Sequence, residues 1–161
     1  MLRPPTLREV YDALGDALIN VELKVFGSDC ITETTGADAL VEAALAEVIA
    51  IGGQDRTLFS SFDETAVELV KTAQPGFYSA LISNTPDNAL VERALELQQD
   101  AIHPLFSVSE ETVQLALDEG LQVNVWGVNN ADFMQQQIDK GSTAIITDEP
   151  GLLADLLAED G

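Results

Sequence analysis

Cysteine, lysine and long apolar runs are scarce in this sequence, and each scarcity excludes a class of protein. The single cysteine, Cys30, rules out a disulfide framework and a thiolate metal site, because both need several thiols. No apolar run approaches the roughly 18 to 20 residues of a membrane span. Only 6 residues are proline and 46% are hydrophobic, so the chain is too apolar to be disordered.

Positive charge is the largest deficit, with 7 Lys and Arg against 28 Asp and Glu and a net charge of -21. Such a chain repels phosphates instead of releasing their counterions, so we expect no nucleic-acid partner. Anionic membrane surfaces repel it for the same reason. We therefore expect no membrane partner and a cytoplasmic location.

The acidic residues are dispersed through helical segments and do not form a block. Examples are Glu42, Glu47, Glu64, Glu68, Glu92, Glu96, Glu110, Glu111, Asp118 and Glu119. Molar salt shortens the Debye length to about 3 Å and screens the repulsion between such charges. The pattern resembles proteins of salt-loving microbes that keep molar salt in the cytoplasm; the alternative is an ordinary acidic bacterial protein.

Helical and strand patterns alternate along one domain, residues 1–161, with little linker. Period-two or apolar runs predict strands at 19–25, 57–62, 77–82, 101–106, 121–128 and 143–147. Helices are predicted between them, with Thr6, Ser109 and Asn130 as N-caps and Pro86 and Pro150 as first helical residues. Alternation of this kind predicts an α/β fold with a parallel sheet. No glycine-rich phosphate loop follows the first strand, so a dinucleotide-binding fold is poorly supported.

The first predicted strand carries apolar residues on one face and Asn20, Glu22 and Lys24 on the other. Both faces of a strand in a parallel barrel are buried, so these polar residues require an explanation. One is a structural ion pair between Glu22 and Lys24. The other is a carboxylate for a metal and an ammonium for an anionic oxygen, at the C-terminal rim where barrel chemistry lies.

Later strands add Ser61, Asp63, His103 and Asn124 with Trp126. Ser61 has no adjacent base, so a hydrogen-bonding role is favoured over a nucleophile. Asp63 begins a helix and fits an N-cap. His103, the only histidine, fits a packed or hydrogen-bonded residue better than a catalyst. Trp126 ends its strand and fits a core residue or a substrate platform equally well.

Several segments, in order, resemble the glycerophosphodiester phosphodiesterases. They are Pro5 to Val10, Asn20 to Lys24, Ser60 to Asp63, Ile102 to Pro104, Val123 to Asn129 and Ala144 to Pro150. The most specific are the Glu-Leu-Lys strand, the Val-Trp-x-Val-Asn strand and the Ile-Ile-Thr-Asp-x-Pro ending. Together these segments extend over nearly the whole chain.

The resemblance implies a TIM barrel that hydrolyses a glycerophosphodiester to glycerol 3-phosphate and an alcohol, with a bound divalent cation. It implies that Glu22 is a metal-binding carboxylate, that Lys24 contacts the phosphate, and that Trp126 is an apolar wall for the glycerol or the leaving group. A non-catalytic barrel remnant that acts as a binding or interaction module is the alternative.

The sequence departs from the family at its beginning. Family members start with a strand bearing His-Arg-Gly and a second bearing Glu-x-Asp followed by His-Asp, and neither motif occurs here. We therefore expect an incomplete (β/α)₈ TIM barrel with six parallel strands that lacks the first two. We expect Mg²⁺ or Ca²⁺ binding to be weak or absent in this form, and turnover to be lost without the two acid-base histidines. Open strand edges predict a homo-oligomer or association with the missing N-terminal segment.

Overall fold

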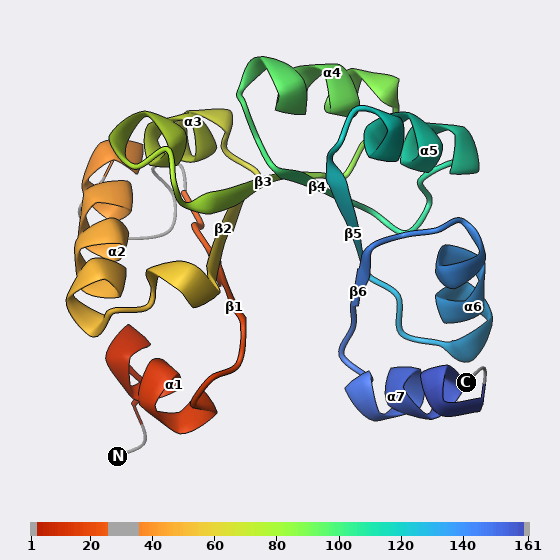
Figure 1. The fold of residues 1–161 in the computed structure, drawn as a ribbon, viewed down its shortest axis with the longest axis horizontal. Coiled ribbons are helices and arrows are strands. Elements are labelled where there is room, and N and C mark those ends of the chain that lie inside the picture. Colours follow the sequence, from red (N-terminus) through yellow and green to blue (C-terminus); the bar gives the residue numbers. More distant parts are fainter. Residues whose placement is uncertain (1–2, 26–35, 160–161) are drawn as a thin grey trace. The chain divides into compact units, whose positions relative to one another are not determined.

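The computed structural model describes residues 3–25 and 36–159, so Cys30 lies outside the described residues. The chain divides into two compact units, Met1–Ala80 and Leu81–Gly161. Figure 1 labels the helices and strands of each unit.

The first unit contains three α-helices and two complete strands. They are α1 (Leu7–Leu14), β1 (Ile19–Glu22), α2 (Ala37–Ile51), a short 3₁₀ turn η1 (Gln54–Arg56), β2 (Thr57–Ser61) and α3 (Glu64–Ala73). Strands β1 and β2 run parallel, with Ile19 opposite Thr57 and Glu22 opposite Ser60. Helix α2 contacts both α1 and α3, so the helices form a layer beside the two strands (Figure 1).

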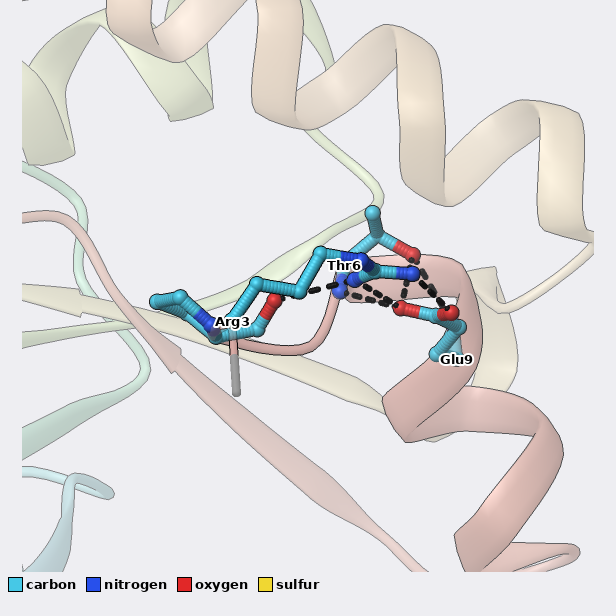
Figure 2. A network of polar contacts seen from close by, with 4 residues as sticks. Arg3, Thr6 and Glu9 are labelled. Atoms are coloured by element: carbon cyan, nitrogen blue, oxygen red, sulfur yellow. Dashed lines mark hydrogen bonds and ion pairs between the residues drawn. The ribbon is translucent and has the colours of Figure 1, made fainter. Parts of the chain in front are cut away.

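Helix α1 begins with the predicted capping box, drawn in Figure 2. The Thr6 hydroxyl accepts from the Glu9 backbone N–H at 3.3 Å, and the Glu9 carboxylate accepts from the Thr6 backbone N–H at 2.8 Å. Arg3 adds a two-pronged ion pair to the same carboxylate, with contacts of 2.7 and 2.5 Å. Together these contacts lower the pKa of Glu9 to about 2, and the contact with Arg3 has the largest effect. The carboxylate is therefore ionised at neutral pH, where it also favours the helix N-terminus.

The core of the first unit is packed between α2, α3 and the strands. Its buried members are Tyr11, Ile19, Leu23, Val41, Leu45, Val48, Phe59, Ala66, Val70 and Phe77. Phe59 and Phe77 meet edge to face, with ring centroids 5.2 Å apart. Since Ile19 and Leu23 are buried while Asn20, Glu22 and Lys24 are exposed, the predicted alternation along this segment is confirmed.

Strand β3 (Tyr78–Ser83) crosses the boundary between the units, and the second unit continues as four helices and three strands. These are α4 (Asn88–Glu96), β4 (Ala101–Pro104), α5 (Glu110–Asp118), β5 (Gln122–Trp126), α6 (Ala131–Asp139), β6 (Ala144–Ile146) and α7 (Pro150–Glu159). Strand β5 pairs in parallel with both β4 and β6. Helix α4 contacts α5, and α6 contacts α7 (Figure 1).

Side-chain caps position the helices of the second unit. The Ser109 hydroxyl accepts from the Thr112 N–H at 3.1 Å, and Asn130 Oδ1 accepts from the Phe133 N–H at 2.9 Å. Both predicted N-caps are confirmed. The prediction that Pro86 is a first helical residue is wrong, because α4 begins at Asn88 with Asp87 at the N-cap position.

Five of the six strands are shorter than the runs that predicted them, and β3 has the predicted length but lies one residue later. Strand β1 ends at Glu22 instead of residue 25, and β4 includes Pro104 but stops there instead of at residue 106. Apolar character continues past the last ladder hydrogen bond because the loop residues Leu23 and Val108 are also buried. Strand ends therefore follow backbone pairing, which hydrophobicity does not report.

The six strands follow one another in the sheet in the order β1-β2-β3-β4-β5-β6. Each consecutive pair is separated by at least one helix, which is the connection that parallel strands need. The predicted α/β class with six strands is confirmed. Among the residues that the structure describes, no helix is long and apolar enough to cross a lipid bilayer.

Candidate functional site

A hollow of about 260 Å³ lies where β1 and β2 end, lined by residues 22–25 and 61–63. Its walls combine apolar side chains with the charged groups of Glu22, Lys24 and Asp63. The carboxyl ends of parallel strands meet at one edge of a sheet, and loops at that edge carry the chemistry of α/β barrels.

Glu22 and Lys24 form the ion pair that their spacing predicts. Lys24 Nζ lies 3.5 Å from Glu22 Oε1, and the two side chains are 59% and 34% exposed. An exposed pair of this kind contributes about 0 to 1 kcal/mol to stability, so stability alone does not explain it. An ammonium has three donors and one carboxylate does not occupy them all, so Lys24 can also receive an anionic oxygen.

Ser61 and Asp63 have the hydrogen-bonding roles that their sequence context favours. The Ser61 hydroxyl donates to the Leu23 carbonyl oxygen at 2.6 Å and accepts from the Asp63 N–H at 3.0 Å. Asp63 Oδ1 accepts from the Ala66 N–H at 2.9 Å and so caps α3. Ser61 is 1% exposed. A hydroxyl committed in this way is suited to holding the backbone, and among the described residues its hydrogen bonds go to backbone groups and not to a base.

The donors at the hollow do not by themselves fit a divalent cation. Mg²⁺ and Ca²⁺ take six to eight oxygen ligands, commonly with several carboxylates. Glu22 is paired with Lys24, and Asp63 is engaged as a helix cap. Within residues 3–25 and 36–159, no group of three or more His, Cys, Asp and Glu could hold a metal ion. A metal here would need further ligands, from water, from a bound substrate or from residues outside these ranges.

In the second unit, His103, Asn124 and Trp126 meet on the neighbouring strands β4 and β5. The Asn124 side-chain amide donates to His103 Nε2 at 3.0 Å, and Trp126 Nε1 donates to the His103 carbonyl oxygen at 3.1 Å. Strand β5 ends at Trp126, which is partly buried. The structure therefore brings these three predicted residues together, with the indole at the end of its strand.

His103 is a buried neutral base, 1% exposed. With Nε2 accepting from Asn124, the proton resides on Nδ1, a buried atom that has no hydrogen-bond partner among the described residues. Burial lowers the pKa of His103 to about 4, because the imidazolium would lose its hydration without gaining a counter-charge. At neutral pH this ring cannot serve as a general acid. The packed role that its sequence context favours is the one observed.

A polar network joins the loops after β5 and β6, and the sequence predicts no role for it. Asn129 Nδ2 donates to Asp148 Oδ2 at 2.7 Å, while Asn129 Oδ1 accepts from the Asp148 N–H at 2.9 Å and from the Thr147 hydroxyl at 3.1 Å. One asparagine thus ties two loops that are 18 residues apart in sequence. Asn, Thr and Asp at strand ends favour such loop contacts, but the sequence does not identify the partners.

Comparison with known proteins agrees with this arrangement of strands. The family model for the glycerophosphoryl diester phosphodiesterase family matches residues 3–152. A glycerophosphodiester phosphodiesterase from Caldanaerobacter subterraneus subsp. tengcongensis is 29% identical over 165 residues, covering 99% of this chain and 64% of the relative. A crystal structure from Silicibacter pomeroyi, described as a glycerophosphoryl diester phosphodiesterase, is 27% identical with a TM-score of 0.85; the match covers 98% of this chain and 57% of that one.

A more distant structure shares the fold. An Oleispira antarctica phosphodiesterase, solved in complex with the product sn-glycerol-3-phosphate, is 21% identical with a TM-score of 0.83, over 96% of this chain and 61% of that one.

An α/β chain of six parallel strands that superposes on these proteins has the fold of an incomplete TIM barrel. This chain belongs to the glycerophosphoryl diester phosphodiesterase family. It spans 57 to 64% of the length of the relatives described above.

Proposed function

We propose that these 161 residues form the glycerol phosphate-binding part of a glycerophosphodiester phosphodiesterase. The reaction would convert a glycerophosphodiester and water to glycerol 3-phosphate and an alcohol. In this proposal Lys24 contacts the phosphate, Glu22 is a metal-binding carboxylate, and Trp126 is an apolar wall for the glycerol or the leaving group.

The observation that carries the proposal is the Glu22–Lys24 pair at the hollow where β1 ends. Its 3.5 Å separation places one cation and one carboxylate together at the strand edge where barrel chemistry lies. With a net charge of -21, the chain repels a phosphate at long range. A cation positioned inside the site is therefore needed to retain one. The family membership and the name of the Caldanaerobacter relative support the same activity.

The described residues do not supply all the groups that the hydrolysis would need. Glu22 would contribute one ligand to Mg²⁺ or Ca²⁺, and the other ligands would come from outside the described residues. His103 does not fit an acid-base role, because it is buried and neutral at pH 7. We therefore infer that residues 1–161 on their own bind glycerol 3-phosphate but hydrolyse glycerophosphodiesters only at the background rate.

A non-catalytic binding module is the second candidate. The burial of the only histidine favours it, since typical acid-base catalysis is worth about 10²- to 10⁴-fold and this ring is not placed to supply it. The two candidates share the binding site. They differ in whether supplying the family's acid-base histidines restores turnover.

Titration with glycerol 3-phosphate tests the proposal. The chain has three lysines and one tryptophan, so side-chain NMR signals of Lys24 and the fluorescence of Trp126 can each be followed without overlap. We expect the Lys24 signals to change, and a change in Trp126 fluorescence tests the proposed role of the tryptophan separately. Lys24→Gln should weaken binding at least tenfold, because it removes the only cation at the hollow among the residues described there.

Arg8→Gln is the matched control. Arg8 is an exposed cation of the first unit that pairs with Glu47 at 3.2 Å, outside the hollow, so its loss changes the net charge equally. If both variants weaken binding equally, the loss of affinity is due to the change in net charge, and a site at Lys24 is refuted. A response of Lys24 without any response of Trp126 would remove the tryptophan from the site.

We also propose a working environment of molar salt and an assembly larger than one chain. Exposed acids along α2, α3 and α4, such as Glu42, Glu64, Glu68 and Glu92, support the first. Strand β1 ends the sheet order on one side and β6 on the other, where Ile146 is 39% exposed. Pairing of these strands with a second copy, or with a strand from outside the described residues, would protect them.

A further inference from the structure

The Ser61 hydroxyl contacts the backbone between Glu22 and Lys24, the ion pair at the hollow. It donates to the carbonyl oxygen of Leu23, which separates Glu22 from Lys24 in the chain, at 2.6 Å. It accepts from the Asp63 N–H, at the start of α3, at 3.0 Å. One buried side chain therefore links the end of β1 to Asp63, the N-cap residue of α3.

The link acts where the β-ladder has ended. Strand β1 stops at Glu22, and the Leu23 N–H donates to the Ser60 carbonyl oxygen at 2.7 Å, the last backbone hydrogen bond from β1 to β2 among the described residues. Beyond it, the peptide that leads to Lys24 is held through the Leu23 carbonyl by Ser61. Leu23 is 3% exposed, so its buried side chain anchors this peptide on one side. The Ser61 hydroxyl holds the carbonyl oxygen of the same residue.

We propose that Ser61 is a positioning residue that holds Lys24 against Glu22 and aims the ammonium into the hollow. The inference rests on the proposed function for the identity of the ligand, but the positioning itself does not. Without the hydroxyl, the Leu23 carbonyl and the Asp63 N–H both lose a partner, and the peptide before Lys24 is free to rotate.

Ser60 offers a matched control on the same strand. It is 0% exposed, and its hydroxyl donates to Asn20 Oδ1 at 2.9 Å, so Ser60→Ala also removes one buried hydroxyl and one hydrogen bond to β1. The change leaves the Leu23 carbonyl and the Asp63 N–H untouched. A general loosening of the unit would affect both variants, whereas loss of positioning affects Ser61→Ala alone.

The first experiment measures the Glu22–Lys24 contact without any ligand. Glu22→Gln is made in the wild-type, Ser61→Ala and Ser60→Ala backgrounds, and the change it causes in the Lys24 side-chain NMR shifts is compared. We expect Ser61→Ala to reduce that change at least twofold and Ser60→Ala to preserve it. An equal change in all three backgrounds, or an equal reduction by both serine variants, would overturn the proposal.

The second experiment measures glycerol 3-phosphate affinity in the same variants. We expect Ser61→Ala to weaken it at least fivefold and Ser60→Ala to stay within twofold. If Ser61→Ala does not fold, Ser61→Cys replaces it, because a thiol is of similar size but a weak donor; wild-type affinity in that variant would contradict the proposal. If the wild type binds no glycerol 3-phosphate, the proposed function fails, and the ligand-free comparison still decides the role of Ser61.

Discussion

Acid between pH 6.5 and 4 should destabilise this protein through the buried imidazole of His103. The pKa of this buried imidazole is about 4 in the folded chain, against 6.5 for an unperturbed histidine. Between these pH values the imidazole is therefore protonated in the unfolded chain and neutral in the folded chain. Stability from the neutral ring is fully present above pH 6.5 and is lost as the pH falls toward 4.

The size of the loss follows from the two pKa values. A difference of about 2.5 pH units at 1.36 kcal/mol per unit gives about 3 kcal/mol. Domains of this kind are stable by about 5 to 15 kcal/mol, so the loss is a large fraction of the total. It is not reduced by solvent screening, because the side chain is 1% exposed.

Urea unfolding at pH 7 and pH 4, at one fixed KCl concentration, measures this loss in the wild type and in His103→Gln. The glutamine variant does not titrate there, so the difference between the two proteins isolates the imidazole from the 28 acidic residues. We expect the wild type to lose about 3 kcal/mol more than the variant on acidification. Equal losses would refute a buried neutral histidine, as would an NMR titration of this single imidazole with a midpoint near pH 6.5.

The remaining predictions concern packing, salt, assembly and turnover. Gly53→Ala should lower the free energy of unfolding in urea by about 1 to 3 kcal/mol, because the new Cβ would lie 2.5 Å from Cε1 of the buried Tyr11 ring. Gly76→Ala is the control, since a Cβ there would have nothing within 4 Å, and equal losses in the two variants would contradict this packing. The melting temperature should rise strongly from dilute buffer to molar KCl as salt screens 21 net negative charges, and a flat response would remove the salt-adaptation proposal. Light scattering in molar salt should report a dimer or larger species, whereas a monodisperse 17.2 kDa particle with a cooperative melt would show that the open strands need no partner. Hydrolysis of glycerophosphocholine by residues 1–161 should stay at background with or without Mg²⁺ or Ca²⁺, and metal-dependent turnover lost in Glu22→Gln would show that His103 was wrongly discounted.

The sequence predicted the local features of this fold well because local chemistry determines them. Thr6, Ser109 and Asn130 cap helices through contacts with residues three positions ahead, so their role is visible in the sequence. The same holds for Glu22 and Lys24, since residues two apart on an extended segment share a face. Pro86 failed because a proline fits a turn before an N-cap as well as it fits a first helical turn.

Contacts between distant segments were less accessible to sequence reasoning. A hydrogen-bonding role for Ser61 could be predicted, but not that its partner is the carbonyl of Leu23, 38 residues earlier. The contact of Asn129 with Thr147 and Asp148 likewise depends on how two loops meet. Burial of His103 depends on the packing of neighbouring strands, and only coordinates show which nitrogen is left without a partner.

The central claim is that Lys24, held beside Glu22 at the end of β1, receives the phosphate of glycerol 3-phosphate. A crystal structure of the chain soaked with glycerol 3-phosphate tests it most directly. The account predicts a phosphate oxygen within hydrogen-bond distance of Lys24 Nζ, in the hollow lined by residues 22–25 and 61–63. Phosphate density elsewhere on the protein, with that hollow empty at saturating ligand, would contradict it.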